Sequence, residues 1–229
     1  MALEKYTEKR NFENTPEPAG KKQTKSSFRF VVQRHEASRL HYDFRLELGG
    51  VLKSWAVPKG PSLDPKDKRL AMMVEDHPSD YIDFEGRIPE GNYGAGTVIV
   101  WDKGSFVPVD KDHNEISEKQ ALKGVEDGEL KFSIKGKKIK GEFVLVQLKK
   151  AEKGNAWLLI KHKDEFAEAG YNSENDMTAK QKATIKKNAA SEIPQTRITK
   201  EKVAARKPVA TASTPARVKK KSARKTVKS

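Results

Sequence analysis

The chain has 229 residues, of which 35% are hydrophobic and 34% are charged, so it can form one substantial domain with non-core segments attached. It contains no cysteine, which excludes a disulfide framework, a thiolate nucleophile and any zinc or iron–sulfur site with cysteine ligands. The first residues, MALEKYTEKR, are rich in charge, and no stretch approaches the ~20 apolar residues of a membrane-spanning helix. We therefore expect a soluble protein without a secretory signal.

The net charge of +14 is concentrated at the C-terminal end of the chain. Residues 197–229 hold 12 of the 46 Lys and Arg residues but 1 of the 32 Asp and Glu residues, and they include no aromatic side chain. Such a segment cannot bury enough apolar surface to fold, and its charge suits phosphate backbones. We predict an N-terminal arm over residues 1–26, a β-barrel domain over 27–165, a partly helical linker over 166–195 and a disordered Lys/Arg-rich tail over 196–229.

Short apolar runs separated by Gly, Pro and Asp fill the region between the arm and the linker. They predict strands at 28–34, 40–48, 51–57, 69–75, 96–102, 128–134, 141–148 and 156–161. Gly49 and Gly50 between two of these runs indicate a tight hairpin. About eight short strands at this spacing are typical of a mainly β fold, either a compact barrel or a sandwich. One or two short helices are expected, at 117–124 and 178–190.

The strand predicted at residues 40–48, LHYDFRLEL, has one apolar and one polar face. Alternation places His41, Asp43 and Arg45 together on the polar face. If the preceding strand folds back on it, His35 approaches the same position. Two imidazoles and one carboxylate can hold a divalent cation such as Mn, Fe or Zn, and Arg45 beside them suits an anion that bridges both. A polar strand that simply faces solvent is the alternative.

The segments that follow add a second set of polar side chains, namely Lys59, Arg69, Glu75 and Tyr81, together with His77 at the end of a predicted strand. A single His at such a position is usually structural, but a neighbouring metal site favours a role facing a ligand. The glycine-dense run at residues 86–97, GRIPEGNYGAGT, is typical of a tight turn and suits a position next to a ligand.

A series of long motifs then points to one family. KRNFENTPEP, FVVQRHEASRLHYDFRLE, SWAVPKGPS, VEDHP, IPEGNYGAGTVIVWDKG and WLLIKHKD occur in this order between Tyr6 and Asp164. In these motifs the chain resembles the 3′-phosphoesterase module of bacterial DNA ligase D, in a stand-alone form. The resemblance implies a compact β-barrel that holds Mn²⁺ in a groove, with Zn²⁺ or Co²⁺ as alternatives. It also implies removal of a 3′-terminal ribonucleoside at primer–template ends, followed by removal of the remaining 3′-phosphate to leave a 3′-OH.

The resemblance also implies roles for individual side chains. The metal ligands would be His35, His41 and Asp43. The groups around the scissile phosphate would be Arg45, Lys59, Arg69 and His77, with Gln33, Glu75 and Tyr81 in supporting positions. In the arm, Arg10 and Glu17 match positions that serve ribonucleoside removal. A member of the family has Asp where this chain has Asn11, a departure that leaves the phosphate-removal site intact and bears on the efficiency of ribonucleoside removal.

Two other functions fit parts of the pattern. An Fe(II)/2-oxoglutarate oxygenase also uses two His and one carboxylate on a β scaffold, and a non-catalytic nucleic-acid-binding module would rely on the basic tail. A ligase is excluded because the nucleotidyl-transfer motif K-x-D-G is absent. We expect a cytoplasmic, nucleoid-associated monomer that acts on DNA or DNA/RNA primer–template 3′ ends, with a separate DNA ligase and end-joining factors as partners and no membrane contact.

Overall fold

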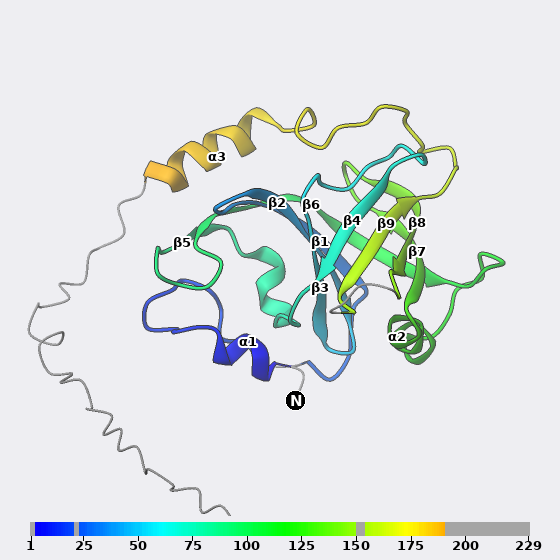
Figure 1. Cartoon of the computed structure of the whole chain (residues 1–229), viewed down its shortest axis with the longest axis horizontal. Helices are drawn as coiled ribbons and strands as arrows, with labels where there is room; N and C mark the ends of the chain where they lie inside the picture. Colours follow the sequence, from blue (N-terminus) through cyan, green and yellow to red (C-terminus); the bar gives the residue numbers. More distant parts are fainter. Residues whose placement is uncertain (1–2, 21–22, 150–153, 191–229) are drawn as a thin grey trace, which may run out of the picture. The chain divides into compact units, whose positions relative to one another are not determined.

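A closed antiparallel β-barrel forms the centre of the structure, a computed structural model that describes residues 3–20, 23–149 and 154–190 (Figure 1). The barrel strands are β1 (Arg29–Glu36), β2 (Leu40–Leu48), β3 (Val51–Val57), β4 (Lys68–Met73), β6 (Gly96–Val109), β7 (Glu129–Lys135), β8 (Lys140–Gln147) and β9 (Ala156–Lys161). They pair in the order β1-β2-β3-β4-β9-β8-β7-β6, and pairing of β6 with β1 closes the ring. The prediction of an eight-stranded barrel is confirmed.

Three short elements were not predicted from the sequence, namely α1 (Glu4–Glu8), the 3-10 helix η1 (Ser79–Asp83) and β5 (Gly86–Ile88). In addition, β6 continues to Val109, beyond the end predicted at residue 102. Pro108 argues against a strand, but β1 pairs with β6 only as far as Ser105, and beyond it the Pro108 carbonyl accepts from the Ile116 N–H at 3.0 Å, so the missing proline N–H interrupts no β1–β6 hydrogen bond. The extended part of β6 pairs with β7 on its other edge.

The two predicted helices are present, as α2 (Glu118–Asp127) and α3 (Ala179–Ala190). Ser117 begins α2 with a capping box that includes Gln120, and Gly128 ends it in the left-handed conformation. Gln181 of α3 donates hydrogen bonds to two carbonyls of β6 at 2.9 and 2.7 Å. The tail predicted to be disordered lies outside the described residues. Within the described ranges, no helix has the length and apolar character needed to cross a bilayer.

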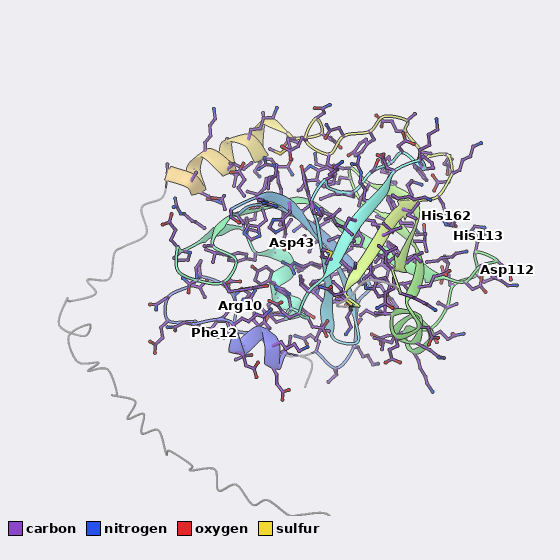
Figure 2. All side chains as sticks on the ribbon, viewed as in Figure 1. Arg10, Phe12, Asp43, Asp112, His113 and His162 are labelled. Carbon is purple, nitrogen blue, oxygen red and sulfur yellow. The ribbon has the colours of Figure 1, made fainter. Side chains whose placement is uncertain are left out.

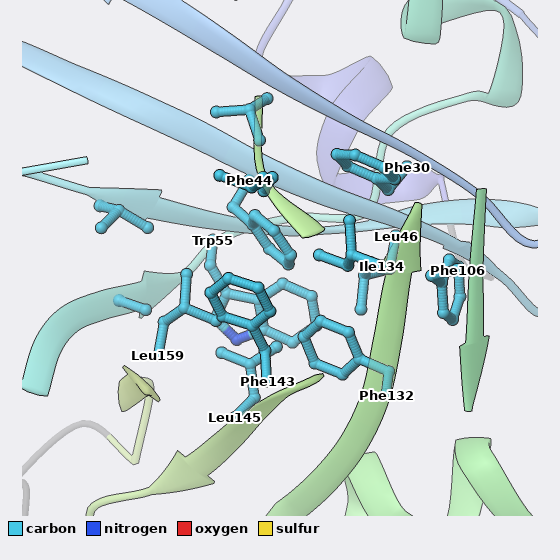
Figure 3. Close-up of a cluster of buried hydrophobic side chains, with 14 of the residues drawn as sticks. Phe30, Phe44, Leu46, Trp55, Phe106, Phe132, Ile134, Phe143, Leu145 and Leu159 are labelled. Atoms are coloured by element: carbon cyan, nitrogen blue, oxygen red, sulfur yellow. The ribbon is translucent and has the colours of Figure 1, made fainter. Parts of the chain in front are cut away.

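Apolar side chains fill the barrel interior and hold the strands together (Figure 3). On β2 the inward residues are Tyr42, Phe44, Leu46 and Leu48, each at most 1% exposed. They meet side chains from the opposite strands, including Trp55, Phe132, Phe143 and Trp157. Burial of several aromatic rings, each of ~150–250 Å², makes this interior the main source of stability.

A second apolar cluster lies on the outer surface of the barrel and fixes the parts that cover it. Val31, Leu52 and Val98 point outward from their strands and pack with Tyr6 of α1 and Tyr81 of η1. Tyr6 is fully buried, and its hydroxyl donates to the carbonyl of Pro18 at 2.7 Å. The N-terminal arm and η1 therefore form a second layer over β1, β2 and β3. The outward side chains of β2 lie beneath this layer.

Candidate metal and phosphate site

His35, His41 and Asp43 come together on the outer face of the β1–β2 hairpin. The antiparallel register pairs His35 directly with His41, and Asp43 is two residues further along the same face. The Asp43 carboxylate lies 3.3 Å from His35 Nδ1 and 3.7 Å from His41 Nε2. One donor atom from each residue lies within 4.8 Å of the others, and in the described residues no other group of His, Asp or Glu meets this criterion. The predicted folding back of β1 onto β2 is confirmed.

The hydrogen bonds of the two imidazoles determine which nitrogens face Asp43. His35 Nε2 is 3.0 Å from the carbonyl of Gly94, and His41 Nδ1 is 2.9 Å from the carbonyl of Arg39. A carbonyl only accepts hydrogen bonds, so these nitrogens are the protonated ones. The opposite nitrogens then present lone pairs toward the Asp43 carboxylate. Three electron-pair donors that converge in this way fit a divalent cation. A metal-ligating His commonly donates its other ring N–H to a backbone carbonyl, as His35 and His41 do here.

Arg45 contacts the same carboxylate oxygen of Asp43 as His35 does. Its Nη2 lies 3.2 Å from Asp43 Oδ2, while Nε donates to Gln33 Oε1 at 2.8 Å and Nη1 donates to Ser54 Oγ at 2.9 Å. Burial raises the pKa of Asp43, but the adjacent charge of Arg45 opposes it, and that pKa is held well below its ordinary value. Asp43 is therefore ionised when the protein is folded, as a metal ligand must be.

His77 lies 3% exposed beside this network and is held neutral. Its Nδ1 is 2.9 Å from the carbonyl of Glu75, so Nδ1 carries the proton and Nε2 accepts from Arg10 Nη2 at 3.2 Å. Burial, together with the charges of Arg45 and Arg10, pushes the pKa of His77 well below its ordinary value. In this arrangement Nε2 serves as a hydrogen-bond acceptor.

The N-terminal arm reaches the site through Arg10. Its guanidinium donates to Glu17 Oε1 at 2.8 Å and to Glu75 Oε1 at 3.1 Å, in addition to His77. The hydroxyl group of Tyr81 (Oη) donates to the same Glu17 oxygen at 3.0 Å. The side chains of Arg10, Glu17 and Glu75 are at most 4% exposed. These contacts bring together the arm residues and the barrel residues that the sequence had placed in one site.

Asn11, the position at which the chain departs from the family pattern, lies in an exposed turn of the arm. Its Oδ1 accepts a hydrogen bond from the backbone N–H of Glu13 at 3.2 Å. The side chain therefore stabilises the turn that follows Arg10.

Lys59 and Arg69 lie apart from this network. They line a pocket of about 450 Å³ at the start of β2, which also includes Leu40 and Tyr42, the sequence neighbours of His41. Arg69 Nη2 donates to Asp67 at 2.7 Å, and its buried Nε has no hydrogen-bond partner. In the described part of the chain, no hydrogen bond or ion pair joins either cation to the metal-ligand group.

The five histidines of the chain divide between two places. Three belong to the site described above. His113 and His162 instead contact Glu142, at 2.7 and 3.4 Å. Figure 2 shows Arg10 and Asp43 on one side of the molecule and these two histidines on the other. The site is therefore a local concentration of His, carboxylate and Arg side chains.

Comparison with known proteins identifies the family. A model of the DNA ligase D 3′-phosphoesterase domain matches residues 33–147, from Gln33 in β1 to the end of β8. The chain belongs to this family. The matched segment includes the metal-ligand group, Arg45, Lys59, Arg69 and His77, whereas Arg10 and Glu17 of the arm precede it.

Multifunctional non-homologous end joining proteins named LigD are similar to this chain. The LigD of Pseudomonas aeruginosa is 53% identical over 165 residues, covering 71% of this chain and 19% of that protein. The LigD of Mycolicibacterium smegmatis is 40% identical over 171 residues, covering 71% of this chain and 21% of that protein. The LigD of Mycobacterium tuberculosis H37Rv is 39% identical over 165 residues, with coverage of 71% and 20%. The chain thus spans about a fifth of the length of these relatives.

Several residues of this 3′-phosphoesterase domain were not predicted as part of its site. Ser54 joins Arg45 to His77, and Lys9 donates to Glu75 Oε2 at 2.9 Å. Ser54 occupies an outward position of β3 opposite Arg45, so strand alternation and register identify it once the pairing is known. Lys9 has no comparable signal in the sequence. The turn at residues 86–97 was expected next to a ligand, and its Gly94 carbonyl does hold His35.

Proposed function

We propose that this chain is a metal-dependent 3′-phosphoesterase that heals DNA 3′ ends. It removes a 3′-terminal ribonucleoside from a primer–template end as a phosphodiesterase, and then removes the 3′-phosphate as a phosphomonoesterase to leave a 3′-OH. The observation that supports this most strongly is the convergence of three electron-pair donors, from His35, His41 and Asp43, directly beside the buried guanidinium of Arg45. A cation and a guanidinium side by side suit a phosphoryl group.

Mn²⁺ is the cation that we propose, with Zn²⁺ or Co²⁺ as alternatives, because two imidazole nitrogens and one carboxylate oxygen form a donor set that these metals accept. When bound, such a cation lowers the pKa of water and neutralises charge on a phosphoryl oxygen. His35 and His41 would hold it through the nitrogens that face Asp43.

The side chains of the protein supply the remaining interactions with the phosphoryl group. Arg45 is fixed by Gln33, Ser54 and Asp43, so its charge is already oriented and needs little reorganisation to stabilise the transition state. His77 accepts from Arg10 and so orients its guanidinium, whose positive charge suits the leaving oxygen. Arg10 comes from the arm, which gives the arm a role in the removal of the terminal ribonucleoside.

The cellular role that we propose is the processing of DNA ends before they are joined. The relatives are named for non-homologous end joining. We propose that this chain works with a DNA ligase and end-joining factors, as a monomer in the cytoplasm near the nucleoid. The Lys/Arg-rich residues 196–229, which lie outside the described structure, would add affinity for phosphate backbones without sequence preference.

A labelled primer–template that ends in one ribonucleotide, and a second one that ends in a 3′-phosphate, test this proposal. Each is incubated with and without Mn²⁺, with wild-type protein and with His41→Ala. Mn-dependent conversion of both substrates to a 3′-OH, lost in the variant, is the expected result. Phosphate removal alone would limit the proposal to the monoesterase step and assign the difference to Asn11. A folded, metal-bound protein that acts on neither substrate contradicts the proposal and favours a non-catalytic nucleic-acid-binding module.

A further inference from the structure

Tyr93 exposes an aromatic ring at the edge of the site and has no role in the apolar clusters. It belongs to the turn between β5 and β6 and is 49% exposed. Neither cluster of buried apolar side chains in the described residues includes it. The turn is formed by backbone hydrogen bonds from Asn92 to Pro89 and from Ala95 to Asn92, at 3.2 Å each. The conformation of the turn therefore does not depend on the tyrosine ring, and the ring is free to serve another purpose.

The backbone of this turn connects Tyr93 rigidly to the metal ligands. The next residue, Gly94, accepts a hydrogen bond from His35 Nε2 at 3.0 Å through its carbonyl. Gly94 has a positive φ of 76°, a conformation that glycine adopts without strain. The ring of Tyr93 is thus held one residue away from the partner of a metal ligand.

Two cations of the arm, Lys9 and Arg10, lie over the Tyr93 ring. Lys9 Nζ is 4.4 Å from the ring centroid, and the guanidinium carbon of Arg10 is 5.8 Å from it. Lys9 also donates to Glu75 and lies 3.4 Å from the Tyr93 hydroxyl. An exposed ring with positive charges close to it is a combination by which proteins bind single-stranded nucleic acid, where bases stack on aromatic side chains and cations neutralise phosphates.

We propose that Tyr93 binds the nucleobase of the 3′-terminal ribonucleoside by stacking, and so positions the nucleoside that the phosphodiesterase step releases. This inference rests on the proposed function and extends it to a substrate-binding residue. Stacking uses the face of the base and no hydrogen-bond pattern, so it accepts all four bases. The terminal ribonucleoside is absent from a primer that ends in a 3′-phosphate. The contribution of Tyr93 is therefore confined to the first of the two steps.

The competing explanation is that Tyr93 only fastens the arm through Lys9. Tyr93→Phe removes the hydroxyl near Lys9 but keeps the ring that Lys9 contacts, so the choice of substrate is what separates the two explanations. If Tyr93 only fastens the arm, the effect of Tyr93→Ala does not depend on whether the substrate has a terminal base. If Tyr93 stacks on the base, the effect is seen only when the terminal base is present.

Steady-state kinetics of Tyr93→Ala, Tyr93→Phe and Tyr93→Trp on three Mn²⁺-supplemented substrates test the proposal. The substrates are a primer–template that ends in a ribonucleotide, the same primer with an abasic terminal ribose, and a primer with a 3′-phosphate. Tyr93→Ala is expected to lower kcat/KM about 10- to 100-fold on the ribonucleotide end, mainly through KM, and to leave the other two substrates unchanged. The Phe and Trp variants keep near-wild-type values. Phe166→Ala, at an aromatic residue with 41% exposure, is the matched control and behaves like wild type.

Two results would overturn the proposal. One is an equal loss on all three substrates, which assigns Tyr93 to holding the arm or the turn. The other is an unchanged kcat/KM of Tyr93→Ala on the ribonucleotide end. If the wild-type protein cleaves none of the substrates, the proposed function fails separately. Stacking is then measured without turnover, from the fluorescence of a 3′-terminal 2-aminopurine ribonucleotide, which is quenched on binding to wild type and not to Tyr93→Ala.

Discussion

From Tyr42 to Leu48 both faces of strand β2 are buried, but they are stabilised in different ways. The inward side chains are apolar and lie in the barrel interior. The outward side chains of Asp43, Arg45 and Glu47 are charged, yet these residues are only 7%, 3% and 1% exposed. A polar face of a strand normally faces water, and here the arm and η1 cover it instead. The same strand therefore borders the apolar barrel interior on one face and carries a buried network of charged side chains on the other.

This difference determines which substitutions each face of β2 tolerates. The interior depends on apolar area and close packing, which are not directional, so side chains of similar volume replace one another at low cost. The outer face depends on individual partners, because a buried charge without its counterpart is strongly destabilising. Asp43 needs Arg45, and Glu47 needs Arg29, whose guanidinium donates to it at 2.7 and 2.9 Å. The proposed site lies on the face where each charged residue depends on a particular partner.

The largest effect is expected from Asp43→Asn, a change on the outer face that preserves shape. The variant loses the only carboxylate of the predicted metal-ligand group, and hydrolysis should fall by about 1000-fold or more. Mn²⁺ affinity, measured by isothermal titration calorimetry, should fall with it. Asp127→Asn, at an exposed residue of α2, is the matched control. Wild-type hydrolysis by Asp43→Asn would show that the chemistry does not use this site.

Phe44→Ala tests the opposite face one residue away. The ring is fully buried in the barrel interior, and its removal should lower the free energy of unfolding by about 3–5 kcal/mol. Urea unfolding measures this loss, and Phe44→Leu should recover a large part of it. Hydrolysis per folded molecule and the Mn²⁺ stoichiometry should remain close to wild type. A selective loss of metal binding in a folded Phe44→Ala protein would contradict the separation of the two faces.

The inner face was more predictable from the sequence than the outer one. Alternation in LHYDFRLEL predicts which side chains point inward, and the hairpin at Gly49-Gly50 predicts how β2 pairs with β3. The grouping of His35, His41 and Asp43 follows from the same reasoning, because it depends on local pairing alone. The family resemblance added Arg10 and Glu17.

Contacts between distant segments could not be predicted from the pattern. Lys9 meets Glu75 across 66 positions of the chain, and neither strand period nor turn chemistry predicts such a contact. Lys59 and Arg69 line a pocket that includes both sequence neighbours of His41, and their place around the scissile phosphate stays a prediction.

A smaller effect is expected from Arg10→Ala, which removes the link between the arm and the outer face. Glu17 and Glu75 lose their shared partner, but the arm can detach and let water reach both carboxylates, so the cost should be about 1–3 kcal/mol. Limited proteolysis should cut the arm faster than in wild type, and urea unfolding measures the stability. Lys5→Ala, at an exposed arm residue, is the control. An arm that remains equally protected in Arg10→Ala would show that the apolar contacts of Tyr6 are sufficient to hold it.

The smallest effect concerns Glu47 and its dependence on pH. Burial raises the pKa of Glu47, but hydrogen bonds from Arg29 and from the Ser27 N–H outweigh it and hold the pKa below its ordinary value of 4.5. A carboxyl whose pKa is lower in the folded state stabilises the protein above that ordinary value, and the stabilisation is lost as pH falls through the folded pKa. Glu47→Gln should therefore be less stable than wild type by about 1 kcal/mol near neutral pH.

The difference in free energy of unfolding between wild type and Glu47→Gln should decrease as the pH falls below 4.5, because Glu47 of the wild type then takes up a proton and becomes neutral as well. Urea unfolding of both proteins at a series of pH values measures the gap. Since the Arg29 side chain is 43% exposed, added salt should also narrow it at neutral pH. A gap that is constant with pH and salt would mean that Glu47 acts through shape and neutral hydrogen bonds. In that case the rule that buried charges on the outer face depend on charged partners would apply to Asp43 and Arg45 but not to the far end of the same strand.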